Sequence, residues 1–258
     1  MTLMTNAMDD LYEQVLRDME MALDKLATQV PRPQRVPFGT HFVIRYVEKT
    51  AQQAIVQKLA RIITGLRSAL LLLKHGLVQE QAVICRVLGD LQEDVLFLSF
   101  GIKNCELETK SHKLFLDAFY EEEFDNPESA LDSTQKRPML SRQKIQAYLA
   151  ESGAKASIGN RSLNQEVART IFKGFSGFVH GASPQIMDMY GGNPGHFHVH
   201  GMLGTPRMKE FERDIWNYFE RGLATFCIAA ETFGDQELFA WLVTQKIQFD
   251  AESERKRI

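Results

Sequence analysis

The chain has 258 residues and a net charge of −3, with 44% hydrophobic and 24% charged residues. This composition is ordinary for a globular protein, and it excludes the strong overall basic field that tight non-specific binding to nucleic acid or to an anionic membrane requires. No uncharged apolar run approaches the ~18 residues of a membrane span, so no membrane partner is expected. The N-terminus carries no signal-peptide pattern. The three cysteines form no CxxC pair, which is typical of reduced core thiols in a cytoplasmic protein.

The first predicted element is an amphipathic helix that ends near Gln29. Its apolar residues follow helical spacing: Leu11, Val15, Met19, Leu23, Leu26 and Val30. Two prolines then predict a rigid connector over 31–40. We therefore divide the chain into an N-terminal helix and connector, 1–33, and a main helical bundle, 34–258. The short segment 41–46 fits either a strand or the start of the next helix.

Most of the remaining chain also shows helical periodicity. Long antiparallel neighbours are expected over 46–74, which ends at a glycine, and 79–100, because only a short turn joins them. Further helices are predicted at 111–124, 141–153, 163–180 (with a capping box at Ser162 and Gln165), 205–233 and from 238 onward. Polar, turn-rich segments separate them. The sequence predicts an all-α bundle of about seven or eight helices with a short histidine-containing β-arm or loop.

The helix predicted over 79–100 is apolar around most of its circumference, yet it carries one charged stripe. Arg86, Asp90 and Glu93 are spaced i, i+4, i+7 and therefore share one face. Charges on a largely buried helix must be paired or must face a wet site, because unpaired burial is costly. One interpretation is an intrahelical Arg86–Asp90 pair beside a solvated Glu93. The other is a ligand-binding polar seam.

A second polar feature is the segment SGFVHG, where Ser176 and His180 lie one helical turn apart among several glycines. The functional hypothesis is that both side chains face Arg86, Asp90 and Glu93 and complete one ligand site. In that site Arg86, Glu93 and His180 are the candidate catalytic residues. The alternative is a hydrogen-bonded structural histidine at the end of its helix.

A third feature is the segment GHFHVHG. If this segment is extended, His196, His198 and His200 point to one face. Alternating imidazoles can bind Zn²⁺ or Mn²⁺, so these residues predict a metal site that needs a further ligand. The alternative is a short β-arm whose histidines bond to loops or to a second subunit.

The R-x-x-x-D stripe at Arg86 and the later S-x-x-x-H-G helix end at His180 carry a family resemblance. Together they resemble a group of uncharacterised bacterial helical proteins that are distantly similar to the HEPN superfamily, over roughly 46–233. HEPN domains are four-helix domains associated with nucleotides or RNA, many of them in defence systems. The resemblance implies a nucleotide, RNA or small anionic ligand and a role in defence or stress response.

Catalytic HEPN ribonucleases carry the signature R-N-x-x-x-H. Its histidine corresponds to His180, its asparagine position holds Ser176, and its arginine position holds Phe175. The ribonuclease motif is therefore incomplete, and Arg86 would have to supply the missing guanidinium from another helix. Three hypotheses follow: a HEPN-like ligand-binding protein, a metal-dependent hydrolase or nuclease, and a non-catalytic oligomerisation protein that forms a homodimer.

Overall fold

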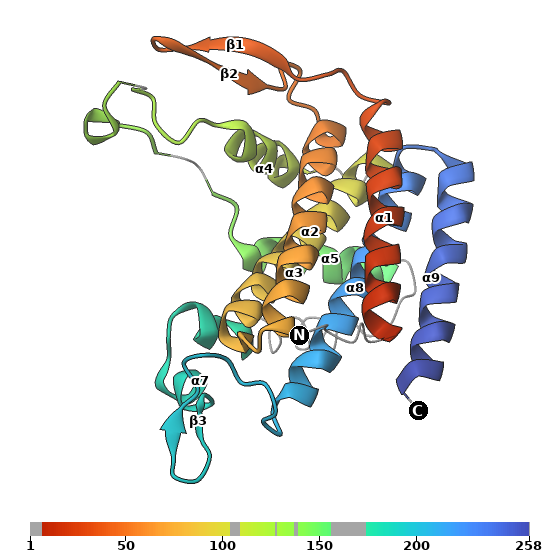
Figure 1. The fold of residues 1–258 in the computed structure, drawn as a ribbon. Helices are drawn as coiled ribbons and strands as arrows, with labels where there is room; N and C mark the ends of the chain where they lie inside the picture. Colours follow the sequence, from red (N-terminus) through yellow and green to blue (C-terminus); the bar gives the residue numbers. More distant parts are fainter. Residues whose placement is uncertain (1–6, 104–108, 127, 137–138, 156–173, 258) are drawn as a thin grey trace.

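The structure is a computed structural model that describes residues 7–103, 109–126, 128–136, 139–155 and 174–257. The all-α prediction is confirmed. The bundle is built from long helices that run side by side (Figure 1), namely α1 (Ala7–Ala27), α2 (Ala51–Lys74), α3 (Val78–Lys103), α8 (Met208–Thr232) and α9 (Gln236–Arg257). None of the described helices is both long and apolar enough to span a membrane.

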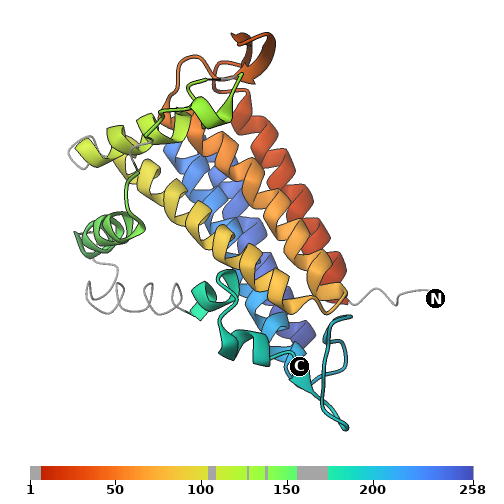
Figure 2. The same ribbon diagram turned by 90° about the vertical axis from the view of Figure 1, so that its left-hand side faces the viewer.

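The N-terminal helix α1 is an integral part of this bundle. It packs against α2, α8 and α9. Leu16, Met19 and Leu26 are fully buried and belong to the same hydrophobic cluster as the core residues of the other helices. Figure 2 shows α1 alongside α2 over most of its length. Helix α1 therefore contributes to the main hydrophobic core.

The α2–α3 hairpin follows its sequence closely. The capping box of α2 is formed by Thr50 and Gln53. At its other end Gly76 adopts φ 69, and the amides of Gly76 and Leu77 bond to Leu73 and Leu72, which is a Schellman motif. This turn makes α2 and α3 adjacent, with the most extensive packing of any helix pair, as predicted.

A β-hairpin that the sequence analysis did not predict follows α1. Strand β1 (Gln34–Phe38) pairs antiparallel with β2 (His41–Arg45), with Val36 opposite Val43. The prediction of a rigid connector over 31–40 was wrong, because residues 34–38 form a strand. The segment 41–46, which fitted either a strand or a helix, is mostly strand. Pro37 can be accommodated because an isolated hairpin has only edge strands. Helix α2 accordingly begins at Ala51, later than the predicted start.

Shorter elements cover one side and one end of the bundle. They are α4 (Lys110–Tyr120), the 3₁₀ turn η2 (Ala130–Asp132), α5 (Arg142–Lys155), helical residues 174–179, α7 (Ser183–Met187) and the paired strands β3 (Tyr190–Gly191) and β4 (His196–Phe197). The predicted helix 163–180 lies mostly outside the described residues, as does its capping box at Ser162 and Gln165. Helix α8 starts at Met208, slightly later than predicted.

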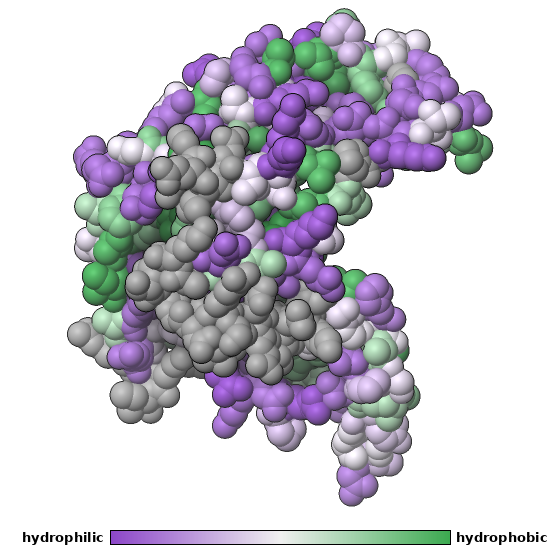
Figure 3. Space-filling model, turned by 180° about the vertical axis from the view of Figure 1, so that it is seen from behind, coloured by the Kyte–Doolittle hydropathy of each residue, from purple (hydrophilic) through white to green (hydrophobic). Residues whose placement is uncertain are grey.

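Residues 183–204, here called the arm, project from the end of the bundle. They are fastened to the α2–α3 turn, where the amide of Met202 donates to the carbonyl of Gly76 over 2.8 Å. Figure 3 shows the molecule hollowed on one side, between the arm below and the segment that carries η2 above. The arm therefore extends into solvent from a well-anchored base.

Candidate functional site

The predicted charged stripe lies on α3, where it faces neighbouring helices. Arg86 forms the expected ion pair with Asp90. Glu93 is not solvated, because its side chain is only 18% exposed and lies beside the guanidinium of Arg142 on α5. Asp90 also binds Arg142, at 3.2 Å. The structure thus brings the three predicted residues into one cluster and adds a partner from another helix.

The centre of this cluster is Asp94, which sequence reasoning missed. One of its carboxylate oxygens lies 2.8 Å from the ammonium of Lys58 on α2, and the other lies 2.6 Å from Arg142 on α5. The guanidinium of Arg142 also donates to the carbonyl of Asp90. These bonds join α2, α3 and α5 through one nearly buried carboxylate. We call the group of Lys58, Arg86, Asp90, Glu93, Asp94 and Arg142 the charged seam.

Lys58 could have been found from the sequence. It lies three residues after Ile55 and four before Ile62, both fully buried, so it falls inside the apolar stripe of α2. Its ammonium sits 4.5 Å from the ring centre of Phe119 and 5.1 Å from that of Phe115. A lysine in such a stripe needs a buried partner, and here that partner is Asp94.

The electrostatics of the charged seam depend on burial. Burial raises the pKa of Glu93, while Arg142 and the amide of Gln146, 3.2 Å away, act in the opposite direction. Burial works against the charge of Arg142, but the carboxylates of Asp94, Asp90 and Glu93 together raise its pKa. The guanidinium therefore stays charged, whereas the Glu93 carboxyl is shifted toward its neutral form.

Helix α8 borders the same region with an aromatic ring and a further guanidinium. Arg221 lies over the ring of Tyr218, 5.3 Å from its centre. The positive charge of Arg221 acts to lower the pKa of Glu93, and that of Arg86 acts to lower the pKa of Tyr218. Burial raises the pKa of Asp214 on the same helix. Arg142 and Arg221 thus act on Glu93, whereas the charges that act on Asp214 are those of Arg213 and Glu210.

Ser176 lies beside α8 on the helical residues 174–179, and His180 follows directly after them. The ring of Phe175 contacts Tyr218 edge-on, with centres 6.0 Å apart. The amide of His180 donates to the carbonyl of Ser176, as expected for one helical turn. The imidazole itself is exposed, and no hydrogen bond or ion pair within the described residues joins it to Arg86. A common site for Arg86 and His180 stays a prediction.

The three predicted metal-ligating histidines lie on the arm. The rings of His196 and His198 are neighbours, with centres 4.5 Å apart, and Nδ1 of His196 lies 3.1 Å from the carbonyl of Pro194. The strand ends at Phe197 and the chain then turns, so His200 does not continue the alternation. Among the described residues no group of three His, Cys, Asp or Glu side chains could hold a metal ion. The strand pairs with β3 of the same chain.

Comparisons with known proteins give no further guide to the site. No protein-family model, no curated protein sequence and no solved structure matches the chain significantly. What the site can do chemically therefore follows from its residues and their geometry.

Proposed function

We propose that this protein is a HEPN-like helical protein that binds a nucleotide, an RNA or another small anionic ligand beside the charged seam. The observation that carries the proposal is the gathering of Arg86, Arg142 and Arg221 near Asp90 and Glu93, where burial raises the pKa of Glu93. Protonation of Glu93 leaves the positive charge of these guanidinium groups without full compensation. Guanidinium groups bind phosphate oxygens in bidentate geometry, so an anionic ligand is the natural complement.

The guanidinium of Arg221, which lies over the ring of Tyr218, supports a nucleotide or RNA among the anions. Tyr218 is held by Arg221 on one side and by Phe175 on another. Tyr218 itself is buried, at 4% exposure, so a base would stack on the guanidinium of Arg221 and phosphates would bind the charged ends of the arginines. Ser176 follows Phe175 directly, and His180 follows one turn later, so both are included in the proposed site. A role in defence or stress response rests on the family resemblance alone.

A thermal-shift screen with nucleotides, short single-stranded RNAs and inorganic phosphate tests this proposal. We expect at least one of these ligands to raise the melting temperature of the wild type, and Arg86→Ala and His180→Ala to abolish that shift. Arg67→Ala is the matched control, because Arg67 pairs with Glu20 on the exposed surface of the bundle. Unchanged responses in both site variants would remove the proposal.

A second function, self-association, is favoured by the surface of the arm. The arm and the adjoining Val179 expose a set of large apolar side chains: Val179, Ile186, Met187, Tyr190, Phe197, Val199 and Leu203. Exposed apolar groups in such number on one projection indicate a protein contact. Its single aspartate, Asp188, is paired with Arg207, so two copies of the arm can meet without charge repulsion.

Sedimentation equilibrium tests self-association through the arm. We expect a homodimer that dissociates when Val199 and Leu203 are both changed to Ser. Leu131→Ser is the control, because Leu131 is 98% exposed on a different loop. Removal of residues 1–33 is unsuitable as a test, since α1 fills the core. A monomeric wild type would exclude this function.

A further inference from the structure

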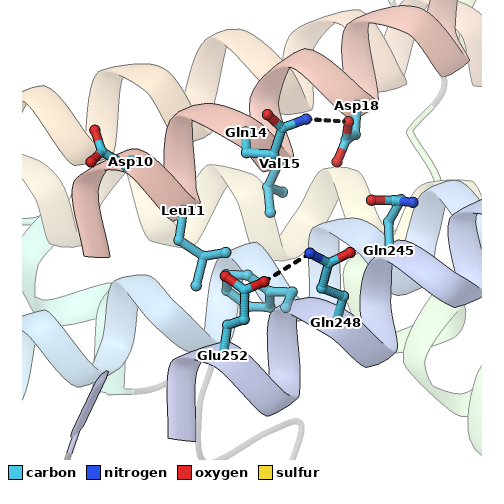
Figure 4. Close-up of a pocket in the computed structure, with 9 residues that line it drawn as sticks. Asp10, Leu11, Gln14, Val15, Asp18, Gln245, Gln248 and Glu252 are labelled. Atoms are coloured by element: carbon cyan, nitrogen blue, oxygen red, sulfur yellow. Dashed lines mark hydrogen bonds between the residues drawn. The ribbon is translucent and has the colours of Figure 1, made fainter. Parts of the chain in front are cut away.

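A polar groove lies between α1 and α9, on the side of the bundle formed by the two chain ends (Figure 4). Its volume is about 160 Å³, which is space for a chain of several non-hydrogen atoms. Its walls are two facing polar stripes, with apolar residues between them. The lining consists of Asp10, Leu11, Gln14, Val15 and Asp18 from α1, and Gln245, Gln248, Phe249 and Glu252 from α9.

The charge of this groove has one sign. Among the residues that the structure describes, its lining includes three carboxylates and three amides but no lysine, arginine or histidine. Asp10 has a simple structural explanation, because it lies in the first turn of α1, where the helix dipole favours a negative charge. Asp18 has no such explanation, since it lies in the middle of the helix.

Asp18 is nearly buried and has no ion-pair partner among the described residues. Its relative exposure is 3%, and its one hydrogen-bond partner is the amide of Gln14, 2.8 Å from one carboxylate oxygen. Within the described residues no Lys, Arg or His comes within ion-pair distance of it. Figure 4 shows its second oxygen turned toward α9 and the groove. Burial raises the pKa of this carboxyl, and the opposing effects of the Gln14 amide and of the neighbouring Arg17 charge do not offset it.

We propose that the groove binds a linear aliphatic amine, with one ammonium on Asp18 and the hydrocarbon chain along Leu11, Val15 and Phe249. An ammonium group supplies both the counter-charge and the hydrogen-bond donors that the second oxygen of Asp18 lacks. The three apolar residues are almost fully buried and form a floor for methylene groups. This site is separate from the charged seam and does not depend on the function proposed there.

The length of the groove favours an amine with more than one ammonium. Asp10, Gln14 and Asp18 are spaced one turn apart, so the first and last are separated by about 12 Å along the helix. An extended triamine can therefore place one ammonium on Asp18 and another near Asp10. Between these two positions, the side-chain amide oxygens of Gln245 and Gln248 on α9 can accept hydrogen bonds from the amine.

Isothermal titration calorimetry of the full chain with spermidine, putrescine and Mg²⁺ tests this site. We expect spermidine to bind more tightly than putrescine, and Mg²⁺ to compete weakly, since it demands several oxygen ligands in octahedral geometry. Asp18→Asn, which keeps the shape of the side chain, is expected to weaken spermidine binding at least tenfold. Asp24→Asn is the matched control, because Asp24 is exposed on the same helix.

Three results would overturn the proposal. They are the absence of spermidine binding at millimolar concentration, equal affinity in Asp18→Asn and wild type, and Mg²⁺ displacing spermidine at equal concentration. Circular dichroism of each variant distinguishes a lost site from a lost fold. If Asp18→Asn unfolds, Val15→Phe, which fills the groove floor, provides the same test and must also abolish binding.

Discussion

Asp94 and Asp18 are both nearly buried carboxylates on long helices of the same bundle, but their surroundings differ. Asp94 touches two cations, Lys58 and Arg142, which come from two other helices. Asp18 has one amide partner on its own helix. A buried charge with complete compensation holds helices together, whereas one without a counter-charge weakens the fold and is available to a ligand. Burial alone therefore does not tell a structural charge from a binding one.

The largest expected effect is at Asp94. Asp94→Asn leaves the ammonium of Lys58, whose side chain is 8% exposed, without its ion pair. Breaking a buried pair in this way typically costs about 3–5 kcal/mol. We expect a loss of this size in the free energy of unfolding, measured by urea denaturation. The double variant Lys58→Met with Asp94→Leu is expected to recover most of it. A loss below about 1 kcal/mol would mean that the pair is not desolvated.

A smaller effect of opposite sign is expected at Asp18. Asp18→Asn removes an uncompensated charge and is expected to stabilise the protein at pH 7 by on the order of 1 kcal/mol. The folded-state pKa is raised, so protonation favours folding. The stability that this carboxyl contributes is present below its ordinary pKa and is lost as pH rises through the folded-state value. The advantage of Asp18→Asn should therefore shrink on acidification. A destabilised Asp18→Asn at neutral pH would contradict the comparison.

Asp235 provides a third case, because it lies at the same α1–α9 interface but both of its carboxylate oxygens have hydrogen-bond partners. It accepts a hydrogen bond from the amide of Leu238 at the start of α9, and it binds Lys25 of α1 and Gln29, which lies just after α1. The amide of Leu238, followed by the ammonium of Lys25, lowers the pKa of Asp235. Its contribution is present above the ordinary pKa and is lost as pH falls through the lowered value, opposite to Asp18.

Asp235 caps the N-terminus of α9, and removal of this cap should lower the stability of the protein moderately. Asp235→Ala is expected to lower the free energy of unfolding by about 1 kcal/mol, as for other helix N-caps. The loss should be largest near neutral pH and should decrease in acid. Thermal denaturation at several pH values measures it. If Asp235→Ala and Asp18→Asn showed the same pH dependence, the assignment of their partners would be wrong.

The smallest effect is expected for a pair on the open surface. Glu20 lies 2.6 Å from Arg67, but about half of each side chain is exposed. Exposed pairs contribute little, because water and salt screen them, so Glu20→Gln should change the free energy of unfolding by less than about 0.5 kcal/mol. Urea denaturation at low and high salt measures it. A change as large as that of Asp94→Asn would show that burial is not what separates these pairs.

Much of the bundle could be predicted from the sequence, because helical periodicity is a local signal. The pairing of α2 with α3 followed from Gly76 and a short turn. The hairpin at 34–45 was missed because Pro37 was interpreted as part of a connector, although an edge strand tolerates proline. Helix boundaries shifted where side-chain caps differed from the expected ones, as at Met208.

The candidate site could be predicted only in part. The i, i+4 spacing gave the Arg86–Asp90 pair, which lies within one helix. The contacts of Asp94 with Lys58 and Arg142 depend on how three helices pack, and no local pattern contains that information. The same limit applies to Asp18, whose environment is set by α9 from the other end of the chain. The position of Lys58 in an apolar stripe was the one available signal.

The central functional claim is that guanidinium groups beside the charged seam bind an anionic ligand. Calorimetric titration with a short single-stranded RNA, performed in parallel on the wild type, Arg86→Ala and Arg67→Ala, tests it most directly. We predict binding to the wild type and to Arg67→Ala, and at least tenfold weaker binding to Arg86→Ala. Equal affinity in all three proteins, or no heat of binding to the wild type for RNA, nucleotide or phosphate, would contradict the claim.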